Sequence, residues 1–146
     1  MVKQIILAFF GSIFPVILFN IDRKKIIWTG FSGAFGWATY LLVYKHNNSP
    51  VMASFAGAFV VGLYSEILAR KLKTPTMQFS VPGIFPLVPG ITAYNTVSAI
   101  VEQNYALASS KGMQVLGVGG AIAFGIMLST TTFNFISKLL RKRKAY

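Results

Sequence analysis

Apolar segments long enough to cross a lipid bilayer succeed one another along this chain, and they constrain its fold more than any other feature. A spanning helix needs about 20 mainly apolar residues, because backbone groups inside the bilayer must find their hydrogen bonds within the segment. Apolar residues make up 54% of the 146 residues and charged residues only 12%, against about 25% in soluble domains. We therefore predict an all-α membrane protein, a single integral membrane domain over 1–146 with about five transmembrane helices, at 4–20, 26–44, 51–69, 84–101 and 115–136.

The first apolar segment resembles a signal peptide only in part. Lys3 precedes an apolar run, as it would in a signal peptide. No small-x-small cleavage site occurs near Phe19 to Ile21, however, and the basic cluster Arg23 to Lys25 would stop transfer. We therefore expect the segment to remain as the first span.

The basic residues form short clusters between the apolar segments, which is typical of loops beside a membrane rather than of a nucleic-acid-binding surface. If all five segments cross, one side holds three basic residues (Lys3, Lys45 and Lys111) and the other holds eleven. If 84–101 is a re-entrant segment instead, each side holds seven. Because basic residues gather on the cytoplasmic side, five crossings are favoured, with the N-terminus outside and the C-terminus in the cytoplasm.

Side chains suited to catalysis are scarce. The acids are Asp22, Glu66 and Glu102, the one histidine is His46, and cysteine is absent. No metal-ligand spacing, phosphate-binding loop or nucleophile elbow occurs among them. A membrane-embedded lipid enzyme is therefore disfavoured, and we expect no enzymatic activity, no metal and no cofactor.

Small residues recur every four positions in three spans, a pattern that lets helices approach closely in lipid. The stripes are Gly30, Ala34 and Ala38; Ser54, Ala58, Gly62 and Glu66; and Gly117, Ala121, Gly125 and Ser129. Glu66 ends the second stripe, so its side chain should face the helix bundle. Two interpretations stay open: an interfacial ion pair with Arg70, four residues later, or proton or ion coupling by an acid turned into the bundle.

The stretch Val81 to Asn95 places helix breakers inside an apolar segment. They are Pro82, Gly83, Pro86, Pro89 and Gly90. Each interior proline removes a helix hydrogen bond, and freed backbone groups survive in a membrane only inside protein or along a wet cavity. Transporters use such breaks to bind substrates, with helix N-termini facing anionic groups. We expect a new helix to begin near Pro89-Gly90, with its positive end toward a substrate carboxylate.

Candidate substrate-binding residues lie around this break. They are Pro86, Pro89, Gly90, Thr92, Tyr94 and Asn95. Gly90 would let the backbone approach the ligand and adopt dihedral angles closed to other residues. Helical spacing favours Thr92 together with Asn95, which leaves Tyr94 as a gate or packing residue. A kinked helix without a ligand is the alternative.

The run Phe85-Pro86-Leu87-Val88-Pro89-Gly90-Ile91-Thr92-Ala93-Tyr94 resembles the proline-glycine motif of the ThrE-type threonine/serine exporter family. The similarity is to the small membrane subunit of the two-component form. Further positions resemble its first loop and its second and third spans: Phe19-Asn20, Arg23, Trp28, Gly30 to Gly36, Met52-Ala53-Ser54 and Gly57. The resemblance covers nearly the whole chain.

This resemblance implies a transport subunit of a bacterial inner membrane, exporting threonine or serine or, in some members, succinate. It also implies a partner, a larger membrane subunit of the same family with a further soluble domain that this chain lacks. A homo-oligomer is a further option, whereas nucleic acid is not an expected partner. The alternative function is a structural or assembly subunit, in which the broken segment docks a partner helix without contacting substrate.

Overall fold

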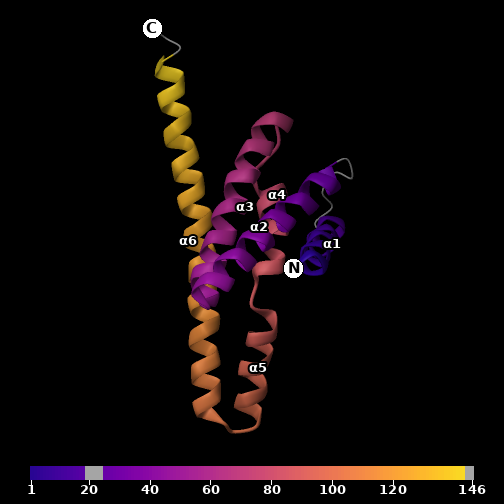
Figure 1. The fold of residues 1–146 in the computed structure, drawn as a ribbon, viewed down its shortest axis with the longest axis vertical. Helices are drawn as coiled ribbons and strands as arrows, with labels where there is room; N and C mark the ends of the chain where they lie inside the picture. Colours follow the sequence, from indigo (N-terminus) through magenta and orange to yellow (C-terminus); the bar gives the residue numbers. More distant parts are fainter. Residues whose placement is uncertain (19–24, 144–146) are drawn as a thin grey trace.

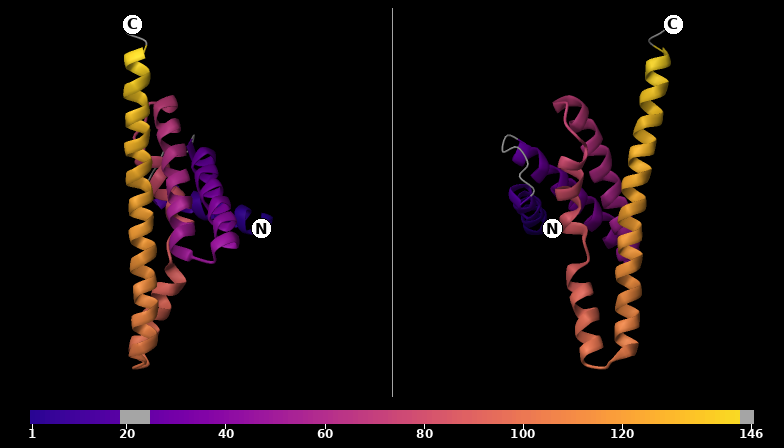
Figure 2. Two further views of the ribbon diagram at one scale, coloured as in Figure 1. Left: turned by 60° about the vertical axis from the view of Figure 1, so that its left-hand side comes forward. Right: turned by 180° about the vertical axis from the view of Figure 1, so that it is seen from behind.

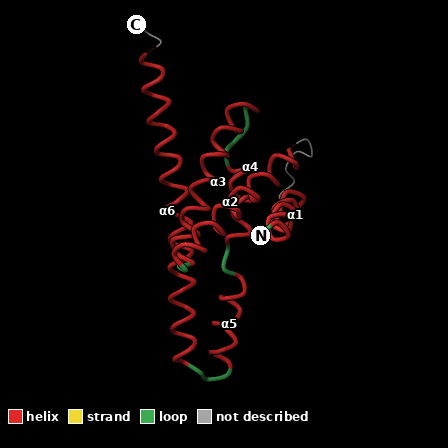
Figure 3. Tube along the Cα trace, viewed as in Figure 1, coloured by secondary structure: helices red, strands yellow, loops and turns green. Residues whose placement is uncertain are grey.

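The computed structural model describes residues 1–18 and 25–143, and every regular element among them is a helix (Figure 1, Figure 3). The elements are α1 (Val2–Leu18), α2 (Ile26–Asn47), α3 (Pro50–Leu72), α4 (Met77–Ile84), the 3-10 turn η2 (Phe85–Leu87), α5 (Gly90–Val101) and α6 (Tyr105–Arg143). The all-α fold expected from the apolar segments is therefore confirmed.

The start of α3 follows directly from local sequence. The Ser49 hydroxyl accepts a hydrogen bond from the Met52 backbone N–H at 3.4 Å. Pro50 occupies the first turn, where a missing N–H leaves no hydrogen bond unmade. Asn48 and Lys73, with φ of 50° and 52°, end α2 and α3 in the left-handed conformation. Residues adjacent in the sequence therefore account for both ends of α3.

Helix α3 is central in the bundle, and it packs against α2, α4 and α6. A buried cluster of Ala58, Val61, Leu87, Val118 and Ile122 joins α3, η2 and α6. Figure 2 shows α6 running the full length of the molecule beside α3, while α1 lies at the far edge against α2. Leu87 thus anchors the turn η2 in the core of the bundle, while Phe85 of the same turn is exposed.

The small-residue stripes form the contacts between helices. A Cβ atom at Gly125 of α6 would lie 2.7 Å from the Phe55 carbonyl oxygen of α3, and one at Gly62 of α3 would overlap the Ser129 side chain of α6. The expected packing faces of α3 and α6 are therefore confirmed. In α1 and α2, Ser12 fits against Gly33 in the same way.

Contacts between α3 and α6 advance in the same direction along both helices. Val51 lies near Gly117, Phe55 near Gly125, and Arg70 near Asn134. The two helices are therefore parallel, and their C-terminal ends lie at the same end of the molecule, opposite the α5–α6 turn (Figure 1).

Three described helices are long and apolar enough to cross a membrane: Ile26–Asn47, Pro50–Leu72 and Tyr105–Leu139. A fourth candidate is the pair Met77–Leu87 and Gly90–Val101, which is bent by 55° at the break. Helix α1 has 17 residues, about 25 Å at 1.5 Å per residue, and falls among the shorter apolar helices. The last two residues of the expected first span, 19 and 20, lie outside the described residues.

Two elements extend beyond their expected bounds. The broken element begins at Met77 rather than at residue 84, because Pro82 is accommodated within α4. Helix α6 begins ten residues before 115, since the Asn104 side-chain oxygen accepts a hydrogen bond from the Leu107 N–H at 3.2 Å and starts the helix there. With 39 residues, α6 is about 58 Å long, well beyond the roughly 30 Å of bilayer hydrocarbon.

Candidate functional site

The break between η2 and α5 lies at Val88 and Pro89. The Val88 backbone is extended, with φ −64° and ψ 130°, and Pro89 has no N–H to continue the helix. The Gly90 N–H donates to the Val88 carbonyl oxygen at 2.8 Å, and α5 begins at Gly90. The predicted helix start at Pro89-Gly90 is therefore confirmed.

The N-terminus of α5 has no side-chain cap. Pro89, in the capping position, makes no side-chain hydrogen bond. The Ala93 N–H donates to the Pro89 carbonyl oxygen at 2.9 Å, whereas the N–H groups of Ile91 and Thr92 have no acceptor within the described part of the chain. The first turn of any α-helix exposes such donors, and the helix dipole adds partial positive charge there. Two backbone donors are thus free to bind an anionic group.

The residues that carry these donors, Ile91 and Thr92, line a cavity of about 470 Å³, which we call the α5 cavity. Its walls come from α2, α3, the break, α5 and α6. The lining residues are Trp37, Tyr40, Tyr44, Pro50, Ser54, Pro86, Leu87, Val88, Pro89, Gly90, Ile91, Thr92, Gln114 and Val118. None of these carries a formal charge, so the positive end of α5 is the main electrostatic feature of the cavity wall.

The residues predicted at the break separate into two groups. Pro86, Pro89, Gly90 and Thr92 line the α5 cavity. Tyr94 and Asn95 are exposed on α5, with 73% of Tyr94 accessible, and neither lines the cavity.

The reason is the packing of α5 on α6. Thr96 lies 3.5 Å from the position that a Cβ atom on Gly112 would occupy, and Ala99 is buried. The Thr96 hydroxyl also donates to the Thr92 carbonyl oxygen at 2.9 Å. Thr92 and Thr96 therefore share the face of α5 that turns inward, which leaves Asn95 outside.

Gly90 does not need the special dihedral angles that we expected from its sequence context. No glycine in the described residues has a positive φ, so that expectation was wrong. An added Cβ atom at Gly90 would meet no heavy atom within 4 Å. The residue leaves open space at the cavity wall rather than resolving backbone strain.

Glu66 is buried in the bundle, with 8% of its surface accessible, as its place in the stripe of α3 predicted. It lies about 18 Å along α3 from Ser54, so it does not belong to the α5 cavity. Within the described residues no ion pair joins it to Arg70. Instead the Arg70 guanidinium donates to the Asn134 side-chain oxygen at 3.1 Å and lies 4.6 Å from the centre of the Phe133 ring. The ion-pair interpretation is therefore wrong.

The cavity also has an aromatic wall, which was not among the residues predicted from the sequence. Trp37 stacks on Tyr40 with ring centres 4.7 Å apart, and Tyr40 stacks on Tyr44 at 5.7 Å. Their spacing of three and four residues places the rings on one face of α2, so the pattern was visible in the sequence. Ser54 and Gln114, by contrast, join the cavity only because α3 and α6 pack beside the break.

Comparison with known proteins adds an independent observation. Residues 4–132 match the family described as Threonine/Serine exporter, ThrE. The chain is 26% identical over 121 residues to a threonine/serine exporter of Corynebacterium glutamicum, which covers 83% of this chain and 24% of that protein. It is 25% identical over 125 residues to an uncharacterized protein of Haemophilus influenzae, which covers 80% of this chain and 42% of that protein. The chain thus spans less than half the length of these relatives, and no solved structure matches it.

The family match and the fold agree. The matched residues include the broken element and every residue that lines the α5 cavity. Phe19-Asn20 and Arg23, which also carry the resemblance, lie outside the described residues. Several helices are apolar enough to span a membrane, as a multi-pass transport protein requires. On these grounds the chain belongs to the threonine/serine exporter family.

Proposed function

We propose that this chain is a subunit of a membrane exporter and that its substrate binds in the α5 cavity. The observation that carries the proposal is the uncapped N-terminus of α5, which leaves the N–H groups of Ile91 and Thr92 free at the cavity wall. Helix N-termini are suited to carboxylates, since several N–H groups converge there with the positive end of the dipole. The substrate carboxylate would accept hydrogen bonds from these two donors.

The lining favours a hydroxy amino acid over a dicarboxylate. A succinate-like substrate would bring a second carboxylate into a cavity with no lysine, arginine or histidine in its wall, and a charge left unpaired in such a site is costly. Threonine or serine brings an ammonium group instead, which aromatic rings such as Tyr40 and Tyr44 attract. Ser54, Thr92 and Gln114 offer partners for the substrate hydroxyl.

Transport into inverted vesicles that contain this chain and its larger partner tests the proposal. We expect uptake of labelled threonine to be reduced by unlabelled serine and to be insensitive to succinate. Inhibition by succinate alone would reject the amino-acid assignment. Absence of transport with either substrate would support the alternative function, an assembly subunit that docks a partner helix at the break.

The partner that we propose is a larger membrane subunit of the same family. The match covers only 42% and 24% of the two relatives, so most of each relative lies outside the matched region. Apolar side chains exposed on α5 outside the cavity, such as Val97 and Val101, would face this subunit or lipid. Purification from the native membrane tests this point: the larger subunit should copurify in a fixed ratio, whereas recovery of this chain alone as an oligomer would argue for a homo-oligomer.

We further propose that the N-terminus lies outside and the C-terminus in the cytoplasm. The parallel course of α3 and α6 supports a crossing between them, because two parallel spans require the intervening chain to return across the bilayer. With that crossing, eleven of the basic residues lie on the side of the C-terminus, which favours the cytoplasm for that side. Helices α4 and α5 together would form this return span. Thiol labelling of intact cells provides the test: Lys45→Cys, at the end of α2, should react with an impermeant reagent, and Lys71→Cys, at the end of α3, should not. The reverse pattern would overturn the orientation.

A further inference from the structure

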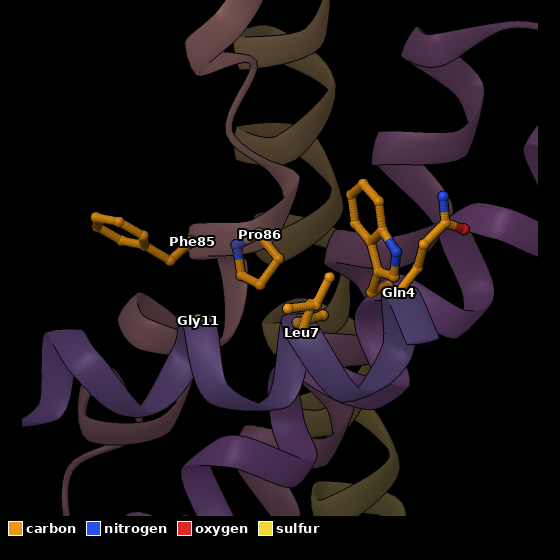
Figure 4. Close-up of a pocket in the computed structure, with 7 residues that line it drawn as sticks. Gln4, Leu7, Gly11, Phe85 and Pro86 are labelled. Carbon is orange, nitrogen blue, oxygen red and sulfur yellow. The ribbon is translucent and has the colours of Figure 1, made fainter. Parts of the chain in front are cut away.

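A second cavity lies on the other side of the break, beneath α1. It has a volume of about 250 Å³, and we call it the α1 cavity. In Figure 4, Gln4, Leu7 and Gly11 of α1 face the segment that carries Phe85 and Pro86. The function proposed above does not use this cavity.

Two residues belong to both cavities. Trp37 of α2 and Pro86 of η2 line the α1 cavity and the α5 cavity alike. Trp37 lies near the middle of α2, between Ile26 and Asn47, which is the depth of the bilayer centre for a spanning helix. Trp37 and Pro86 therefore lie where the two cavities adjoin, at mid-membrane depth.

The Trp37 side chain also carries an unused hydrogen-bond donor. Its Nε1–H is buried and has no acceptor within the described part of the chain. A buried donor without an acceptor is unfavourable, and tryptophan in protein interiors normally finds one. The ring itself is held in place by stacking on Tyr40 at an angle of 10°. The N–H is thus fixed in position at the boundary between the cavities, where a polar group of a ligand would satisfy it.

We propose that the α1 cavity is the second compartment of the translocation path, and that Trp37 with Pro86 forms the gate between the two. This inference rests on the proposed transport function. The substrate carboxylate or hydroxyl accepts a hydrogen bond from the indole N–H as it passes from one cavity to the other. Closure of the indole against Pro86 keeps the two compartments from opening at the same time.

The absence of cysteine from the chain makes thiol accessibility a direct test. Gly11 lines the α1 cavity and Gly90 the α5 cavity, and an added Cβ atom at either position meets nothing within 4 Å. Single-cysteine variants at these positions should therefore fold. With Trp37 in place, a charged, membrane-impermeant thiol reagent should label Gly90→Cys from the outside, whereas Gly11→Cys should be shielded from that side. Gly119→Cys on α6, also in open space, serves as the lipid-facing control.

Two substitutions of Trp37 distinguish the effect of the size of its side chain from the effect of its hydrogen bond. In Trp37→Ala, the rate at which the reagent labels Gly11→Cys from the outside should rise at least about tenfold, because loss of the indole lowers the free-energy barrier to entry of the reagent. In Trp37→Phe, which keeps an aromatic ring, Gly11→Cys should stay shielded from the outside. The same variant should raise the KM for threonine about tenfold, because one hydrogen-bond donor is lost.

Two results would overturn the gate. One is equal labelling of Gly11→Cys from both sides while Trp37 is intact, and the other is no labelling from either side even in Trp37→Ala. Should Trp37→Ala fail to reach the membrane, Trp37→Leu takes its place in the same assay. The labelling pattern does not depend on the substrate. If the substrate is not threonine, the effect on the KM for threonine would thus be lost. The side from which each cysteine is labelled would stay the same.

Discussion

Substitution of Gly90 by valine separates substrate binding from folding more cleanly than any other change at the break. Gly90 is the first residue of α5 and lines the α5 cavity. A Cβ atom there would meet no heavy atom within 4 Å, so the valine side chain begins in open space. Valine also has a higher helix propensity than glycine, by a few tenths of a kcal/mol. Stability should therefore be unchanged or slightly increased.

The affinity for the substrate carboxylate, by contrast, should fall. The valine methyl groups would lie at the cavity wall beside the N–H groups of Ile91 and Thr92 and keep a carboxylate from approaching them. Each hydrogen bond to a charged group contributes about 1.5–3 kcal/mol. Loss of two such bonds at the lower end of that range amounts to about 3 kcal/mol, or roughly a hundredfold in affinity.

The assay is uptake of labelled threonine into inverted vesicles, measured over a range of concentrations and normalised to the amount of inserted protein. Gly119→Val on α6 is the matched control, because it makes the same change in open space away from both cavities. We expect Gly90→Val to lose transport while Gly119→Val keeps it. Normal transport by a well-inserted Gly90→Val variant would refute carboxylate binding at α5 and leave helix docking as the role of the break.

Two further predictions concern Glu66 and the contact between α3 and α6. If the buried carboxyl group of Glu66 handles protons, which is the interpretation of its sequence position that remains, Glu66→Gln should abolish the dependence of threonine export on a pH gradient while threonine still binds; unaltered pH dependence would remove Glu66 from the mechanism. Gly125→Ala would place a methyl group 2.7 Å from the Phe55 carbonyl oxygen, and such overpacking should destabilise the fold by about 1–3 kcal/mol. Gly120→Ala, which meets nothing within 4 Å, should stabilise it by up to about 1 kcal/mol. The free energies of unfolding of these two variants can be compared in mixed micelles. Equal values would contradict the close contact between Gly125 and Phe55.

Much of the architecture could be predicted from local sequence, because membranes leave few options for apolar segments. A backbone in lipid must satisfy its own hydrogen bonds, so long apolar runs had to become helices, and prolines had to mark the break before Gly90. The Ser49-Pro50 start of α3 depends on neighbouring residues alone. The small-residue stripe of α6 predicted its packing face for the same reason, since a period of four places residues on one side of a helix.

Features that depend on contacts between distant segments could not be predicted in this way. Arg70 is within reach of Glu66 along α3, yet it binds Asn134, 64 residues away, because α6 packs in parallel beside it. Thr92 and Asn95 are equally plausible on a helical wheel, and only the packing of α5 on α6 turns Thr92 inward.

The sequence alone thus determined the class of protein, its family resemblance and the position of the helix break, since each depends on residues adjacent in the chain. The tertiary structure decided which side chains surround that break. Trp37, Ser54 and Gln114 come from three different helices, and they share one cavity only because those helices cross at η2. Their positions depend on how the packed helices fit together, and that fit involves residues tens of positions apart.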